Sequence, residues 1–172
     1  LAGWQWFVPW LFSIACIVGL NVATGRGQHG LAVLLLFAMG LLIGISVGST
    51  VYYYASTGSD VIAQAAAATA LFTLALGAGG YATRRDLSFL YRGLFWALLG
   101  LILFGFVMIF VQIPGGSLIY ALFGLVVFGG YILVDFNRLR RAGRGEAVPL
   151  AAGIFLDIFN VFLIFLRIFA RR

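Results

Sequence analysis

Two aspartates interrupt long apolar stretches near the end of the chain. Asp135 lies in "GGYILVDFNRL" and Asp157 in "FLDIFNVFLIFLR", although the chain of 172 residues has only five acidic residues. A carboxyl group at membrane depth is costly and is a functional residue by default. Two such groups in a low-dielectric site cannot both ionise cheaply, so we expect them to share one proton and to titrate in coupled steps. The pair is therefore predicted to be a pH sensor that uses no histidine.

The same carboxylate oxygens are the hard ligands that Ca²⁺ prefers. Two carboxylates are too few for a tight calcium site, which needs about six to eight oxygen atoms. Asp135 and Asp157 are therefore predicted to contact Ca²⁺ weakly and transiently, as groups along an ion path do. Ca²⁺ would be the transported ion, and no cofactor is expected.

A purely structural explanation of these acids stays open. Each aspartate could be neutral, or could bond to a neighbouring backbone group or arginine and only hold helices together. Arg138 follows Asp135 by three residues, a spacing that brings two side chains to one face of a helix.

The composition places these acids in a membrane. Hydrophobic residues make up 63% of the chain and charged residues 9%, and the mean hydropathy is +1.11. A soluble domain of this size needs far more charge on its surface. All 11 basic residues are arginines, and most of them lie in short loops between apolar runs, which excludes a nucleic-acid interface. The sequence predicts one transmembrane domain, residues 1–172, surrounded by membrane lipid.

Six apolar segments can position the acids. Each is long enough to cross about 30 Å of hydrocarbon as a helix, so the predicted fold is an all-α, polytopic transmembrane bundle. Consecutive helices joined by a short connection are normally antiparallel neighbours. The last two segments should therefore bring Asp135 and Asp157 together. The predicted helices cover residues 4–22, 30–53, 61–82, 88–112, 116–137 and 147–169.

Charge predicts the orientation of these helices. Arginines lie in the first, third and fifth connections, whereas the second and fourth have no basic residue. The positive-inside rule places the basic connections in the cytoplasm, so the two acids should lie in the cytoplasmic half of the membrane. Arg171 and Arg172 would then lie on the opposite side. Either the last helix is an exception to the rule, or it re-enters the membrane and returns.

The run Gly77 to Gly80 lies near the end of the third predicted helix. Two explanations stay open. Small residues let two helices approach closely, or the run could act as a hinge.

Three stretches carry a resemblance to a known family. "GGYILVDFNRL" followed by "PLAAGIFLDIFNVFLIFLRIF" resembles the last two helices of the Bax inhibitor-1 family, and "RRDLSFL" resembles its central cytoplasmic loop. The resemblance implies a seven-helix bundle with the last helix at its centre. Six helices are visible here, so the first is expected to be missing from this sequence.

The resemblance also implies a function. Family members are similar to pH-sensitive calcium leak channels of the endoplasmic reticulum or of bacterial plasma membranes. Asp135 and Asp157 match the family's pH-sensing aspartates. A family arginine at the end of the second helix latches to this pair. Arg26 is the candidate for that latch, with Asn21 or a shifted register as the alternative.

Three functions fit these residues to different degrees. The first is a pH-sensitive, calcium-permeable leak channel, and the second is a non-transporting membrane regulator that binds a membrane protease or a cell-death partner. An intramembrane aspartyl protease is disfavoured, because "LVDF" and "FLDIFN" lack the glycine that precedes the acid in such enzymes. The protein is thus not expected to be an enzyme. The composition, with arginine as the only basic residue type and many glycines, suggests that the protein lies in a prokaryotic plasma membrane. If the source is eukaryotic, the expected location is the endoplasmic reticulum.

Overall fold

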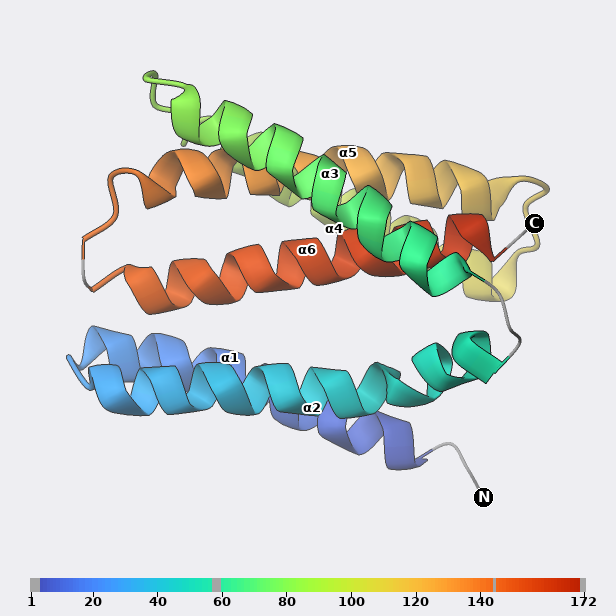
Figure 1. Cartoon of the computed structure of the whole chain (residues 1–172), viewed down its shortest axis with the longest axis horizontal. Helices are drawn as coiled ribbons and strands as arrows, with labels where there is room; N and C mark the ends of the chain where they lie inside the picture. Colours follow the sequence, from blue (N-terminus) through green and yellow to red (C-terminus); the bar gives the residue numbers. More distant parts are fainter. Residues whose placement is uncertain (1–3, 57–59, 144, 171–172) are drawn as a thin grey trace. The chain divides into compact units, whose positions relative to one another are not determined.

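The chain folds into α-helices joined by short connections (Figure 1). The structure is a computed structural model that describes residues 4–56, 60–143 and 145–170. The all-α prediction is confirmed. The third and sixth helices have the predicted bounds, and the other four differ by at most three residues at either end. The helices are α1 (Trp4–Gly25), α2 (His29–Ser56), α3 (Val61–Ala82), α4 (Leu90–Phe110), α5 (Gly116–Leu139) and α6 (Ala147–Phe169).

The helices from α2 to α6 are long and apolar enough to cross a membrane. In α1 the apolar stretch with described side chains is Leu11–Gly25. These lengths confirm a multi-pass integral membrane protein. Because α6 is one continuous helix of 23 residues, about 34 Å at 1.5 Å per residue, the alternative of a re-entrant turn within it is wrong.

The chain divides into two compact units. The first unit comprises Leu1–Ser59 and Ala142–Gly153, and the second comprises Asp60–Arg141 and Ile154–Arg172. Helix α6 therefore begins in the first unit and continues into the second. The single domain over residues 1–172 stays a prediction.

In the first unit, α1 and α2 form a helical hairpin. Gly27, with a φ of 72°, lies in the left-handed region that favours glycine and ends α1. The amide of Gln28 donates to the carbonyl of Ala23 at 2.9 Å, and that of Gly27 donates to Thr24 at 3.0 Å, which is the Schellman pattern. Arg26 lies exposed in this turn.

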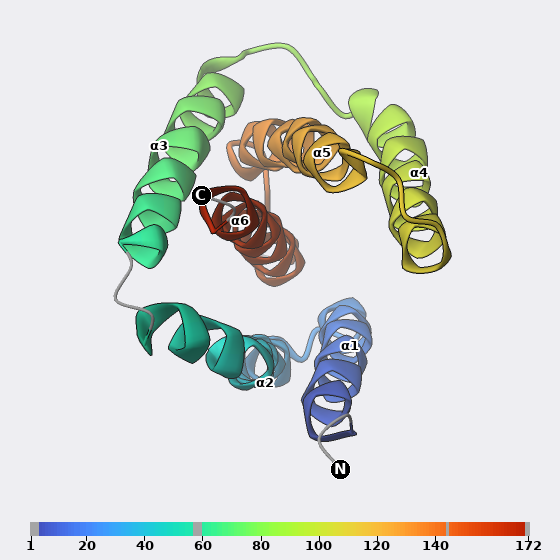
Figure 2. The ribbon, with the colours of Figure 1, turned by 90° about the vertical axis from the view of Figure 1, so that its right-hand side faces the viewer.

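In the second unit, α5 packs between α3 and α4 (Figure 2). Residues of α6 also contact this unit. The ring of Phe165 lies 5.8 Å from that of Phe72 on α3, and Ile164 lies against Gly124 on α5. With nine buried residues, including Asp135 and Asn137, α5 is the core helix of the second unit. The expected central place of the last helix in the complete bundle stays a prediction.

Glycines set the close contact between α3 and α5. Gly77 lies against the ring of Phe136, and Gly80 lies against the backbone of Leu133. The two glycines are three residues apart, so they share one face of α3. Of the two explanations for this glycine run, the contacts support close helix packing.

Candidate functional site

Both predicted acids are buried in the second unit. Asp135 on α5 is 5% exposed and Asp157 on α6 is 8% exposed. Oδ1 of Asp135 and Oδ2 of Asp157 are buried and have no hydrogen-bond partner among the described residues. The charge of Asp135 acts on Asp157, so the two carboxyls lie within electrostatic reach of each other. The shared proton stays a prediction.

Arg138 does not pair with Asp135. Its Nη1 atom donates to the hydroxyl of Tyr91 at 3.2 Å, and its Cζ atom lies 5.2 Å from the centre of the same ring. Within the described ranges the ion pair that forms is Arg141–Asp86. The pairing suggested by the spacing of Asp135 and Arg138 is therefore wrong, because a tyrosine on α4 takes the guanidinium.

A second tyrosine lies beside this contact. Tyr131 is one helical turn before Asp135 on α5, and its ring lies 5.9 Å from that of Tyr91. Tyr131 also lies within electrostatic reach of Asp157. We call Tyr91, Tyr131 and Arg138 the tyrosine–arginine cluster. The sequence held a signal for two of its members, since Tyr131 and Arg138 lie four residues before and three after Asp135.

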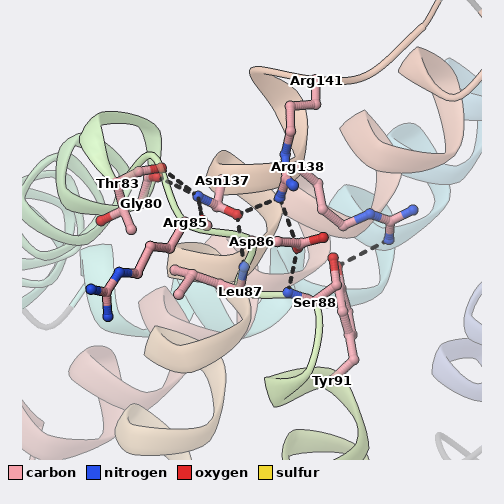
Figure 3. A network of polar contacts seen from close by, with 10 residues as sticks. All are labelled: Gly80, Thr83, Arg85, Asp86, Leu87, Ser88, Tyr91, Asn137, Arg138 and Arg141. Carbon is pink, nitrogen blue, oxygen red and sulfur yellow. Dashed lines mark hydrogen bonds and ion pairs between the residues drawn. The ribbon is translucent and has the colours of Figure 1, made fainter.

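Asn137 anchors the connection between α3 and α4 to the end of α5 (Figure 3). Its side chain is 1% exposed. The amide oxygen accepts from the backbone N–H of Leu87 at 3.1 Å and from Arg141 at 2.7 Å. The amide nitrogen donates to three backbone carbonyls, at 3.1, 2.8 and 3.1 Å. Those carbonyls belong to Gly80, Thr83 and Arg85.

No role for Asn137 follows from the sequence pattern. The available signal was an amide side chain inside an apolar helix, where a buried polar group needs partners. Because Asn137 lies two residues after Asp135, the two side chains leave α5 about 200° apart. Helix α5 thus presents the acid on one face and the loop anchor on another.

A surface ion pair completes this anchor. Arg141 donates to Oδ1 of Asp86 at 2.9 Å, and the same oxygen accepts from the backbone N–H of Ser88 at 2.8 Å. The hydrogen bond from Arg141 holds the pKa of the Asp86 carboxyl well below its usual range, and the bonds from Ser88 add to this effect. The same bond raises the pKa of Arg141. The pair is solvent-exposed, so its contribution to stability is small.

We expect this ion pair to be insensitive to pH between about pH 5 and pH 8. Because the folded-state pKa of Asp86 is depressed, its contribution is present above the ordinary value of 3.8 and is lost only as the pH falls through the lower folded-state pKa. Asp86→Asn should lower the thermal unfolding temperature slightly and by the same amount at every pH in this range. A difference from wild type that varies steeply across the range would contradict the assignment.

Arg26, the candidate latch, belongs to the first unit, whereas both acids belong to the second. Its role as a latch stays a prediction. In the part of the chain that the structure describes, no three His, Cys, Asp or Glu side chains form a group that could hold a metal ion.

These features define a class of protein: a multi-pass helical membrane protein with two buried acids on its last two helices. The family described as "Inhibitor of apoptosis-promoting Bax1" matches residues 1–172. The chain therefore belongs to the Bax inhibitor-1 family.

Several relatives are similar over most of the chain. An uncharacterized membrane protein of Streptococcus pyogenes serotype M3 is 29% identical over 95% of this chain and 76% of its own length. The Golgi anti-apoptotic protein of vaccinia virus (strain Lister) is 35% identical over 91% of this chain and 64% of its own length. The inner membrane protein YbhL of Escherichia coli K12 is 27% identical over 93% of this chain and 72% of its own length.

Proposed function

We propose that this protein is a pH-sensitive, calcium-permeable leak channel in which Asp135 and Asp157 form the pH sensor. The observation that carries the proposal is that both carboxyls are buried in the same unit and that each has an oxygen without a hydrogen-bond partner. A buried, unpartnered carboxylate is unstable unless it gains a proton or a cation. Such a pair is therefore suited to respond to protons and to bind a passing Ca²⁺ weakly.

The proposed mechanism couples the charge of the pair to the open state. When the pair is ionised, it holds a cytoplasmic arginine, for which Arg26 is the candidate, and the path is closed. Acidification neutralises the pair, weakens that contact and opens the path. Each unit of difference between the pKa of the pair in the closed state and its pKa in the open state corresponds to about 1.36 kcal/mol. Two to three such units change a mostly closed population into a mostly open one.

We place the protein in a prokaryotic plasma membrane. The relatives from Streptococcus pyogenes and Escherichia coli are named as membrane proteins, the latter as an inner membrane protein. The basic connections would face the cytoplasm. In a eukaryotic source, the corresponding membrane would be the endoplasmic reticulum.

Calcium flux into proteoliposomes tests the proposal. Wild type should pass Ca²⁺ faster as the pH falls. Asp157→Asn removes one ionisable group and should make flux independent of pH. At alkaline pH this variant should pass about tenfold more Ca²⁺ than wild type for each pKa unit by which the closed and open states of wild type differ. Asp135→Asn should behave in the same way.

A matched control removes a buried polar group elsewhere in the second unit. Thr69 is buried on α3 and donates to its own helix at the carbonyl of Ala65. Thr69→Val should keep the pH profile of wild type. Identical profiles for wild type and Asp157→Asn would exclude the sensor role, and absence of flux from every preparation would exclude the channel.

A second candidate is a non-transporting regulator that binds a membrane protein partner. A viral relative is named as an anti-apoptotic protein, and Arg84 and Arg85 are exposed in the α3–α4 connection, where an acidic partner could dock. This candidate predicts no flux in liposomes, together with a membrane partner that is recovered with wild type and lost with Arg84→Gln/Arg85→Gln. Flux that follows pH in pure lipid would exclude it as the sole function.

A further inference from the structure

The tyrosine–arginine cluster contains a cation that lies close to the acids without pairing with either of them. The charge of Arg138 reaches Asp135, yet its guanidinium is bound by both the hydroxyl and the ring face of Tyr91. An arginine three residues from an aspartate on one helix normally favours a pair. The hydrogen bond and the ring contact with Tyr91 on α4 therefore replace the ion pair that Arg138 would form with Asp135.

Among the described residues, Arg138 is the cation whose charge acts on Asp135. Helix α3 has no charged residue between Val61 and Ala82. On α4, Arg92 is exposed. On α6, Arg167 lies 5.7 Å from the ring of Tyr120, about four turns before Asp135 on α5. Asp157 and Tyr131 are the remaining titratable neighbours, and neither carries a positive charge.

We propose that Arg138 is a movable cation beside the two carboxyls, and that Tyr91 is the positioning residue that holds it away from Asp135. With Arg138 bound to Tyr91, the Asp135 oxygen stays free for a passing cation. If α4 moves away from α5, Arg138 is released, pairs with Asp135 and occupies the same oxygen. This part of the inference deepens the proposed channel function and rests on it.

The proposal assigns α4 a regulatory role. Tyr91 lies near the start of α4, directly after the connection that Asn137 and Arg141 anchor to α5. A partner or lipid that displaces this connection would also displace Tyr91. The conformation of the α3–α4 connection would then control the access of cations to Asp135.

Variants of Tyr91 and Arg138 test the proposal through calcium flux at a fixed, mildly acidic pH, at which the wild-type path should be open while one carboxyl stays ionised. Tyr91→Leu removes both contacts and should lower flux about tenfold, the equivalent of one ion pair of about 1.4 kcal/mol. Tyr91→Phe keeps the ring and should have a smaller effect. Arg138→Gln should not lower flux, and Tyr91→Leu/Arg138→Gln should match Arg138→Gln alone. If each substitution only damaged the structure independently, the loss of flux in the double variant would be the combined loss of the two single variants.

A second measurement reads the movement of Arg138 without transport. In protein labelled with ¹⁵N-arginine, the Nε signal of Arg138 is the one that disappears in Arg138→Gln. It should shift in Tyr91→Leu, and it should take a different position in Tyr91→Leu/Asp135→Asn, because the new pair with Asp135 is then lost. Tyr120→Leu releases Arg167 at the other end of α5 and is the matched control, in which the Arg138 signal and the flux should both stay unchanged.

The outcomes separate this inference from the proposed function. If no variant passes Ca²⁺, the channel is excluded and the Arg138 signal alone decides whether Tyr91 positions the cation. If wild type passes Ca²⁺ and the signal of Arg138 does not depend on Asp135 in Tyr91→Leu, the inference is overturned. It is equally overturned if Tyr91→Leu lowers flux as much in the Arg138→Gln background as in wild type.

Discussion

Replacing Asn137 with leucine is expected to detach the α3–α4 connection from α5 and to destabilise the protein by about 2–4 kcal/mol. The side chain makes five hydrogen bonds, and leucine makes none. Each buried donor or acceptor left without a partner costs about 1–3 kcal/mol, although loop carbonyls near the membrane surface recover part of this from water. The thermal unfolding temperature in detergent should fall by several degrees.

A neighbouring asparagine provides the matched control. Asn160 on α6 donates to the carbonyl of Leu156 in its own helix at 2.7 Å and has no hydrogen bond to another described helix or connection. Asn160→Leu is the same chemical change without the loss of a tertiary anchor. It should leave the unfolding temperature within about 1–2 degrees of wild type, since effects away from anchoring networks are usually small. Equal destabilisation by the two variants would contradict the anchoring role of Asn137.

Proteolysis gives a local measure of the same prediction. Arg84 and Arg85 have exposed side chains, but trypsin needs an extended backbone that the hydrogen bonds to Asn137 prevent. Cleavage after these arginines should accelerate in Asn137→Leu, whereas cleavage after Arg26, in the other unit, should not change. Acceleration at all three arginines would indicate global unfolding instead of a released connection.

Local sequence signals predicted the helices well. The bounds of α3 and α6 were predicted correctly because "STGSD" precedes the first and "RRAGRGEAVP" marks the start of the second with glycine and proline. Helix α2 continues to Ser56, three residues past the prediction, because Tyr52, Tyr53 and Tyr54 continue the helix instead of ending it. The run of tyrosines was therefore not a signal for the end of the helix.

The contacts around the acids could not be predicted in the same way. The partners of Asn137 in the α3–α4 connection are 50 to 54 residues away in sequence, and no local pattern encodes them. For Arg138 the local pattern was misleading, since the spacing favoured Asp135 and the competitor Tyr91 is 47 residues away. Tertiary contacts decided both cases.

The relative depth of the acids was also beyond local reasoning. Asp135 lies four residues before the end of α5, and Asp157 lies ten residues after the start of α6. At 1.5 Å per residue this is a difference of about 9 Å along the two helices. Sequence spacing alone does not fix the offset between the two helices.

The second large effect is expected at Gly80, where α3 approaches the backbone of α5. A Cβ atom at this position would overlap the carbonyl oxygen of Leu133 and lie 2.9 Å from its carbonyl carbon. Backbone atoms cannot rotate away as a side chain does, so Gly80→Ala must push α3 from α5. Forced overpacking of this kind costs about 1–3 kcal/mol, and Gly80→Leu should prevent folding of the second unit.

The adjacent glycine makes this prediction specific. A Cβ atom at Gly79 would lie 3.7 Å from Cδ1 of Leu133, an ordinary contact. Alanine is favoured over glycine within a helix by up to about 1 kcal/mol, so Gly79→Ala should keep or raise the unfolding temperature while Gly80→Ala lowers it. Because Asn137 also donates to the carbonyl of Gly80, the displacement should expose the α3–α4 connection to trypsin as Asn137→Leu does. Opposite signs at two neighbouring glycines cannot arise from helix propensity, which is the same at both positions. Equal unfolding temperatures for the two variants would therefore mean that α3 and α5 do not pack at this face.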